Sequence, residues 1–314
     1  MENDNIHVNG KIKFLSDTKE TNVLNKIGIV ILNYLNYTDT IECIESLETQ
    51  TNQNFEVVIV DNASHNESFS VLDKLYKNKK RIHMIRTDKN LGYAKGNNVG
   101  IQYCKNELQI NNILIVNSDV IFTESNYTDY FINLKTPSNI GAIGTKIIGS
   151  DGLNQNPVYT PITSKRVLKD AAYFSLDDIG IIKYYTTLKK LVTKKQDNSK
   201  FEEKTFPVHG KKYILHGSAI FLTEHYLKRM DGFYPETFLY YEENILGIIM
   251  EKMNLLMLYT DETEIYHKED QSSALSFGNN SSKMFKRYLA QSIRIAVKVK
   301  LSNINQIQQT VNRK

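Results

Sequence analysis

The stretch Ile113-Leu114-Ile115-Val116-Asn117-Ser118-Asp119 indicates the fold class of this chain. Its four apolar residues predict a β-strand that is buried on both faces. Polar groups that follow such a strand lie where open parallel sheets bind their ligands. The Asp119 carboxylate could hold a divalent cation there, because hard cations prefer oxygen ligands. The alternative is a structural turn, since Asn, Ser and Asp are common turn residues.

Strands and helices alternate around this stretch. Apolar runs predict strands at 27–32, 55–60, 82–85 and 112–116, and helical periodicity predicts helices at 38–50, 68–77 and 93–105. Such alternation indicates an α/β fold with a Rossmann-like, mostly parallel central sheet flanked by helices. Because the strands end in polar residues, among them Asn33, Asp61 and Asp119, we expect a nucleotide cleft at that edge of the sheet.

The remaining segments differ in character. Residues 1–25 are polar and are expected to form a loose N-terminal extension. Residues 151–212 predict either a substrate-facing insertion or a solvated structural excursion. Order returns at 213–222, which resembles a strand. A C-terminal extension, 276–314, contains a basic amphipathic helix at 282–301, which suits either an anionic membrane surface or packing with a solvated basic face.

The composition is that of an ordinary globular protein of 314 residues, with 41% apolar and 24% charged residues. No apolar run is long enough to span a bilayer, and the start lacks the pattern of a signal peptide. The two cysteines, Cys43 and Cys104, have no metal-binding spacing and fit a reducing compartment, so a cytoplasmic protein is expected. The net charge of +4 gives no argument for nucleic acid.

Four segments carry candidate chemistry. Asp61 could accept hydrogen bonds from a base or ribose, or could cap a turn. Gly92 and Gly96 allow close backbone approach, and the helix start beside them favours anionic ligands. Glu242 and Glu243 follow an aromatic run, so one could act as a general base, or both could favour a helix start. His267 could bind a manganese-like cation or be structural.

Together these segments resemble the family 2 glycosyltransferases with the GT-A fold, in particular the bacterial rhamnosyltransferase-like branch. The matching segments follow in the family's order over residues 26–275: VILNYLN (30–36), VDNAS (60–64), NLGYAKGNNVGI (90–101), VNSDV (116–120), HGSAIFL (216–222), GFYPETFLYYEE (232–243) and YHKEDQSS (266–273). The resemblance implies a GT-A domain with a nucleotide-binding half at 26–120 and an acceptor and catalytic half at 121–275.

The resemblance also implies residue roles. Asn33 and Asp61 would hold the nucleobase and ribose of a UDP- or dTDP-sugar, with Asn62 nearby, and Gly92 and Asn97 would shape the base pocket. Asn117, Ser118 and Asp119 stand at the family's D-x-D position, so Asp119 would bind Mg²⁺ or Mn²⁺ with His267 close to it. His216, Gly217 and Ser218 would lie beside the donor sugar and the acceptor.

Glu243 occupies the family's base position, and a single displacement would invert the anomeric centre. The family usually has Glu-Asp where this chain has Glu242-Glu243, so Glu242 could instead be the base. An acid and an arginine common in the family are replaced by Ile245 and Ile249. Asn117 also replaces the first acid of the D-x-D motif, which leaves one carboxylate for the metal.

The resemblance implies an inverting glycosyltransferase with a lipid-linked oligosaccharide acceptor in bacterial surface polysaccharide synthesis. The basic helix at 282–301 would allow peripheral contact with the membrane. Two alternatives remain open. One is a sugar nucleotidyltransferase, which would normally carry a basic, glycine-rich loop near the first strand. The other is a catalytically silent nucleotide-sugar-binding module.

Overall fold

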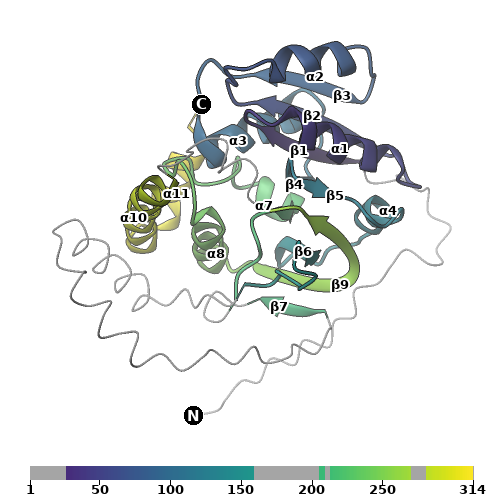
Figure 1. The fold of residues 1–314 in the computed structure, drawn as a ribbon. Coiled ribbons are helices and arrows are strands. Elements are labelled where there is room, and N and C mark those ends of the chain that lie inside the picture. The colour runs from purple at the N-terminus through teal and green to yellow at the C-terminus, as the bar shows by residue number, and fades with distance from the viewer. Residues whose placement is uncertain (1–25, 159–204, 209–212, 270–280, 314) are drawn as a thin grey trace.

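A nine-stranded β-sheet runs through the protein, in the order β3-β2-β1-β4-β8-β6-β9-β5, with β7 paired to β9 (Figure 1). The computed structural model describes residues 26–158, 205–208, 213–269 and 281–313. Within these ranges the predicted α/β architecture is confirmed. The extension 1–25 and most of the segment 151–212 lie outside the described residues.

The first half of the sheet is parallel. Its strands are β1 (Ile27–Asn33), β2 (Phe55–Asp61), β3 (Ile82–Arg86) and β4 (Ile113–Asn117), with β1 between β2 and β4. The crossover helices are α1 (Tyr37–Glu48), α2 (Ser68–Tyr76) and α3 (Gly92–Asn106). These elements agree with the sequence prediction to within about two residues at each end.

The two faces of this half are covered by different helices. Along β1, Val30 packs in one buried cluster with residues of α3, whereas Ile29 and Ile31 pack in another with residues of α1 and α2. All seven residues of β2 are buried. This is why the strands appear in the sequence as continuous apolar runs rather than as alternating patterns.

The second half of the sheet is mixed. The strand β8 (Ala219–Leu222) lies antiparallel between β4 and β6 (Ile140–Ile148), and β6 runs parallel to β9 (Leu256–His267). Two short strands, β5 (Val120–Ile121) and β7 (Phe206–Val208), pair antiparallel with β9. The short helices α4 (Tyr127–Ile132) and α7 (Glu224–Leu227) join this half. Within the predicted strand-like segment 213–222, regular strand structure occupies only β8.

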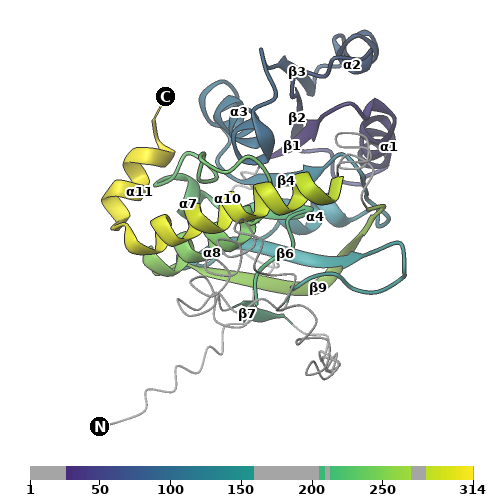
Figure 2. The ribbon, with the colours of Figure 1, turned by 60° about the vertical axis from the view of Figure 1, so that its left-hand side comes forward.

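Two helices follow the sheet at the C-terminus, where the sequence predicted one. α10 (Ser281–Leu301) crosses in front of α8 (Glu242–Lys252), and α11 (Ile304–Val311) begins at a capping box on Asn303 (Figure 2). The Lys298 ammonium lies 2.7 Å from Glu236, and that of Lys300 lies 2.7 Å from Glu251. Part of the positive charge of α10 is therefore neutralised within the protein. No helix in the described ranges is both long and apolar enough to cross a membrane.

Candidate active site

The candidate site forms where β4 ends. The pairing of Val116 with Ala219 places the segment before β8 beside the segment after β4. The Asn117 N–H donates to the Ser218 carbonyl oxygen at 2.9 Å, which ties these two segments together. The predicted groups 117–119 and 216–218 therefore lie next to each other at the carboxyl edge of the parallel strands.

Asp119 and His267 meet through the pairing of β5 with β9. Val120 pairs with His267, and the Lys268 N–H donates to the Asp119 carbonyl oxygen at 3.0 Å. The two buried side chains approach so that His267 Nε2 lies 3.4 Å from Asp119 Oδ1. An amide oxygen, Gln155 Oε1, lies 2.9 Å from His267 Nδ1. Because that oxygen can only accept, Nδ1 must carry a proton, and Nε2 is the nitrogen that faces Asp119.

These two side chains fit a divalent cation in chemistry, since carboxylate and imidazole both bind Mn²⁺-like ions. The hydrogen bond from the far ring nitrogen to an amide oxygen also matches the usual outer contact of a metal-bound histidine. Over the described residues, no cluster of three or more His, Cys, Asp or Glu side chains could hold a metal. A cation at Asp119 and His267 would need further oxygen ligands from its substrate or from water.

His216 lies against His267, with 5.5 Å between the ring centroids. Its Nδ1 accepts from the Ser218 backbone N–H at 3.2 Å and lies 2.9 Å from the Ser218 hydroxyl. Burial, together with the neighbouring His267, lowers the pKa of His216 to about 4, although Asp119 opposes this shift. His216 is therefore a neutral imidazole near pH 7, and its Nε2–H is a donor.

Gly217 leaves open space beside Glu243. A β-carbon built on Gly217 would lie 3.7 Å from Glu243 Oε2, and among the described residues, its two chain neighbours apart, no other heavy atom would lie within 4 Å. The Tyr93 hydroxyl donates to the Gly217 carbonyl oxygen at 2.7 Å and so fixes this peptide from the side of α3. Burial raises the pKa of the Glu243 carboxyl, which makes it a better proton acceptor than an exposed glutamate.

Glu242 has a different environment from its neighbour. Its side chain is buried, and Oε1 has no hydrogen-bond partner among the described residues. Burial, reinforced by the charge of Glu243, raises the pKa of Glu242 to about 8. Thr237 lies near enough to oppose this shift, but its hydroxyl does not meet hydrogen-bond geometry within the described part of the chain. Glu242 is therefore protonated at neutral pH.

The backbone before this acidic pair adopts an unusual conformation. Tyr240 and Tyr241 have φ angles of 69° and 74°, in the left-handed region that non-glycine residues rarely occupy. Leu35 and Ala63, which follow β1 and β2, have φ angles of 64° and 59°. Strained backbone of this kind is concentrated at functional sites, where the surrounding structure holds it in place.

Asn33 and Asp61 form a buried pair at the ends of β1 and β2. Asn33 Nδ2 donates to Asp61 Oδ2 at 2.8 Å, and Asn33 Oδ1 accepts from the Thr40 hydroxyl at 3.0 Å. Asp61 Oδ1 accepts from the Ser64 N–H at 3.0 Å. Both predicted nucleotide contacts thus lie on the same edge as Asp119, and Asp61 also performs the turn-capping role that was its alternative.

Asn62 holds a loop within the protein. Its amide nitrogen donates to Asn90 Oδ1 at 3.0 Å and to the Gly92 carbonyl at 3.2 Å. Its oxygen accepts from the Leu91 N–H at 2.9 Å. The Thr87 hydroxyl lies 3.3 Å from the same oxygen, but its single proton has a nearer acceptor in the Lys89 carbonyl oxygen at 2.9 Å. Both donors of the Asn62 amide are therefore used within the protein, and one lone pair of its oxygen is left.

The start of α3 is likewise occupied by the protein. The N–H groups of Leu91, Gly92 and Tyr93 donate to Asn62, Asn90 and the Phe238 carbonyl. A β-carbon on Gly92 would lie 2.2 Å from that carbonyl oxygen, and one on Gly96 would lie 2.6 Å from Leu32. In the described part of the chain, these three N–H groups and the space beside the two glycines are taken up by neighbouring segments of the protein. The expected binding of an anionic ligand at this helix start stays a prediction.

Asn97 is fully buried in α3. Its Nδ2 donates to the Tyr93 carbonyl one turn earlier at 3.0 Å, whereas Oδ1 has no partner among the described residues. The side chain lies inside the protein and contacts the same helix. Its predicted place in a base pocket would require the surrounding segments to open.

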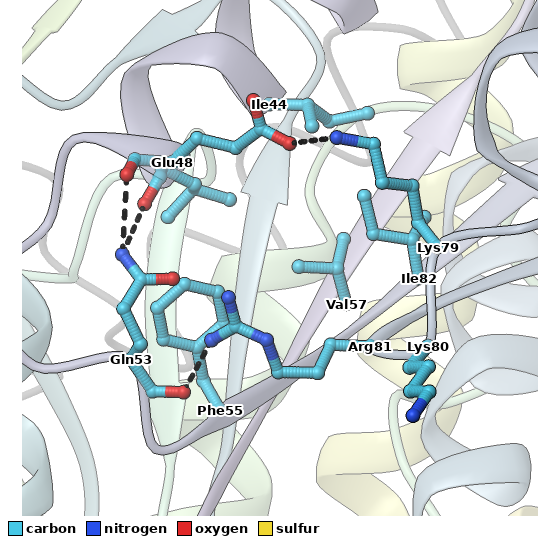
Figure 3. Close-up of a pocket in the computed structure, with 10 residues that line it drawn as sticks. Ile44, Glu48, Gln53, Phe55, Val57, Lys79, Lys80, Arg81 and Ile82 are labelled. Atoms are coloured by element: carbon cyan, nitrogen blue, oxygen red, sulfur yellow. Dashed lines mark hydrogen bonds and ion pairs between the residues drawn. The ribbon is translucent and has the colours of Figure 1, made fainter.

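A cavity of about 230 Å³ lies at the opposite edge of the sheet (Figure 3). Phe55 and Ile82, the first residues of β2 and β3, contribute to its lining, together with Lys79 and Arg81. The Lys79 ammonium is paired with Glu48 at 3.0 Å, and the Arg81 guanidinium lies over Phe55, 5.4 Å from the ring centroid. This cavity is separate from the predicted chemical groups.

Tyr93 and Gln155 belong to the candidate site although no sequence pattern gave them a role. Tyr93 lies within the segment 90–101, whose glycines drew attention instead. Gln155 follows β6 in a stretch with no periodicity, so its contact with His267 depends on tertiary structure.

Residues 28–216 match the sequence pattern of the family described as Glycosyl transferase family 2. The match covers more than half of the chain. The chain belongs to this family. The Low-salt glycan biosynthesis hexosyltransferase Agl10 of Haloferax volcanii is 26% identical over 139 residues, which are 44% of this chain and 42% of the relative. The chain therefore spans less than half of the length of this relative.

Two solved structures are similar to this chain in fold. The mannosyltransferase PcManGT of Pyrobaculum calidifontis, solved with GDP-Man and Mn²⁺, has a TM-score of 0.52 at 11% identity, over 91% of this chain and 72% of its own. GalNAc-T7, solved with UDP, GalNAc and Mn²⁺, has a TM-score of 0.54 at 10% identity, over 93% and 57%. At such identities the likeness concerns the fold alone, and it confirms the GT-A architecture.

Proposed function

We propose that this protein is an inverting glycosyltransferase that moves a sugar from a nucleoside diphosphate to a hydroxyl group of a saccharide acceptor. The observation that carries the proposal is the joint placement of three groups at the carboxyl edge of the sheet: the Asp119–His267 pair, the neutral His216, and Glu243 facing the open side of Gly217. Each group has a separate task in such a transfer.

Asn33 and Asp61 are assigned to the nucleobase and ribose of the donor, and Asn117 and Ser118 to its diphosphate end. Support comes from their position on one edge of the parallel strands, where ligands of such sheets bind. The His216 Nε2–H is assigned as a donor to the diphosphate or the transferred sugar. A neutral imidazole suits this role because it donates without needing protonation.

Asp119 and His267 are the residues that would hold Mg²⁺ or Mn²⁺. When bound, such a cation stabilises the negative charge that develops on the leaving diphosphate. The Mn²⁺ named with both similar structures supports this assignment. Because Asn117 replaces an acid, Asp119 is the single carboxylate that the motif contributes.

Glu243 is assigned as the general base, and Glu242 as a buried neutral acid that supports it. The Glu243 carboxylate removes the proton of the acceptor hydroxyl as the acceptor oxygen bonds to the anomeric carbon. The bond from that carbon to the diphosphate oxygen breaks in the same displacement. Attack from the face opposite the leaving group inverts the anomeric centre, so no covalent sugar–enzyme intermediate is needed.

The donor is proposed to be a UDP- or dTDP-sugar, and the acceptor a lipid-linked oligosaccharide of bacterial surface polysaccharide synthesis. The name of the Haloferax volcanii relative, a hexosyltransferase of glycan biosynthesis, supports a hexose. Peripheral contact with the inner face of the membrane is proposed through the exposed side of α10. That contact depends on residues such as Arg287, because Lys298 and Lys300 are paired with acids.

The proposal is tested by incubating the protein with a panel of UDP-, dTDP- and GDP-sugars and Mn²⁺, with products identified by mass spectrometry. Release of nucleoside diphosphate that is lost in Asp119→Ala supports the transferase. Pyrophosphate release would instead indicate a nucleotidyltransferase, and binding without turnover a silent module. Full activity in Asp119→Ala would contradict the cation assignment.

A further inference from the structure

The end of β9 is held by a chain of hydrogen bonds that determines how His267 presents its ring. Gln155 lies between two side chains of this segment: its amide oxygen is 2.9 Å from His267 Nδ1, and its amide nitrogen donates to a Glu269 carboxylate oxygen. The other oxygen of Glu269 accepts from the Ser150 hydroxyl at 3.2 Å. Glu269 is itself in a left-handed conformation, with φ 68°.

The Glu269 carboxylate determines the orientation of the Gln155 side-chain amide. A carboxylate has only acceptor atoms, so the NH₂ group of Gln155 must face it and the amide oxygen must face His267. His267 must then donate through Nδ1, and the neutral ring has its lone pair on Nε2. In this neutral form the lone pair faces Asp119 Oδ1 at 3.4 Å, so two acceptors oppose each other unless a second ring proton or a metal cation lies between them.

The reversed amide would have the opposite effect. With its NH₂ group toward His267, Gln155 would donate to Nδ1, and the ring proton would move to Nε2. His267 would then donate to Asp119 directly, and both side chains would be satisfied without a cation. Glu269 opposes this closed arrangement, because a reversed amide would place an acceptor against its carboxylate.

We infer that Gln155 and Glu269 are positioning residues that fix the Nδ1–H tautomer of His267 and so direct its Nε2 lone pair, with Asp119, toward a divalent cation. The inference deepens the proposed function and rests on it for the cation, but its statement about the tautomer stands on the metal-free protein.

Gly149 makes room for this pair. A β-carbon at Gly149 would lie 2.4 Å from the Gln155 amide nitrogen and 2.6 Å from the Glu269 carboxylate oxygen. The turn that carries it is closed by hydrogen bonds from the Gly149 N–H to the Leu153 carbonyl at 3.0 Å and from the Gln155 N–H to the Ile147 carbonyl at 2.8 Å. Gly149→Ala should therefore displace Gln155 from Glu269 without touching His267.

The test compares the full chain with Gln155→Leu, Glu269→Gln and Gly149→Ala. Glu269→Gln keeps the size of the side chain and removes only the constraint on the amide. Gln102→Leu is the matched control, since Gln102 donates to the Asp231 carbonyl at 2.7 Å, outside the site. Histidines are labelled with ¹⁵N, and the His267 resonances are assigned by their loss in His267→Gln. Ring tautomers are read by NMR in metal-free protein at pH 8.5, and Mn²⁺ affinity by electron paramagnetic resonance.

In the wild type and Gln102→Leu we expect the Nδ1–H tautomer of His267. In the three variants we expect mixed tautomers and Mn²⁺ binding weakened by about 10- to 100-fold, the usual effect of losing an outer-shell partner. An unchanged tautomer and unchanged affinity in both Gln155→Leu and Glu269→Gln would overturn the inference. If the tautomer shifts as expected but the wild type binds no Mn²⁺ with or without UDP, the positioning role is supported and the proposed cation site is overturned.

Discussion

The Glu243 carboxylate lies beside the open face of Gly217, where an added methyl group would be 3.7 Å from Glu243 Oε2 and, chain neighbours apart, would have no other heavy atom of the described ranges within 4 Å. Most glycines of the candidate site region are tightly packed, as at Gly92 and Gly96, so this free volume distinguishes Gly217. The space beside Gly217 is where the acceptor hydroxyl and the anomeric carbon are proposed to meet.

Gly217→Ala should therefore separate stability from activity. The methyl group fits without strain, so we expect the free energy of unfolding to change by less than about 0.5 kcal/mol. Sugar transfer should fall at least tenfold, because the methyl group occupies substrate space. Urea denaturation and initial-rate assays measure the two effects. Wild-type transfer rates in Gly217→Ala would show that the substrates react elsewhere.

The two adjacent glutamates should respond differently to the same substitution. Glu243→Gln should abolish transfer while nucleotide affinity stays within about twofold, because the base acts only in the chemical step. Glu242→Gln should keep most of the activity, because the protonated carboxyl and the amide are similar in shape and both are neutral. Isothermal titration calorimetry with the nucleotide and a transfer assay check both variants. An inactive Glu242→Gln with an active Glu243→Gln would reverse the assignment.

Glu242 should also make stability depend on pH. Its pKa rises from 4.5 to about 8 on folding, so the folded protein retains a proton that the unfolded chain has released between these values. The free energy of unfolding should then decrease as the pH rises from about 5 to 8, by on the order of a few kcal/mol. Chemical denaturation over this range should show a shallower decrease in Glu242→Gln, which should be the more stable protein at pH 8. Parallel pH profiles for the two proteins would contradict a buried neutral Glu242.

Asn62 should behave as a structural residue. Asn62→Ala removes three hydrogen bonds and leaves the Leu91 N–H without its partner, so we expect a loss of roughly 2 to 4 kcal/mol in the free energy of unfolding. Asn78→Ala, at an exposed asparagine just after α2, is the control and should cost under about 1 kcal/mol. Equal stability of the two variants, with nucleotide binding lost only in Asn62→Ala, would restore a ligand-binding role.

The sequence predicted the parallel half of the sheet well because its signals are local. Residues 113–116 are all apolar and therefore predict a strand that is buried on both faces. Asn117 marks the end of this strand. The candidate site was predicted less completely. Asp61 and Asn62 are adjacent and equally polar, yet Asn62 is committed to the loop before α3. That commitment follows from contacts with Asn90 and Gly92, and no local pattern encodes which polar group faces a ligand.

The contribution of Gln155 could not have been predicted for a similar reason. It depends on Glu269, which lies far from Gln155 in the sequence. The turn at Gly149 and the segment with Glu269 are neighbours only because β6 and β9 lie side by side. His267 was found because it ends an alternating strand, but the orientation of its ring is determined by these distant partners.

The pairing of Val120 with His267 has a consequence for the order in which the molecule assembles. The strands β1 to β4 come from one continuous stretch of the chain and can pair once their crossover helices form. His267 can approach Asp119 only after β9 has joined the sheet. Closing so long a loop is entropically costly and slow. A nascent chain that ends before β9 would therefore carry the edge assigned to the nucleotide without the cation centre.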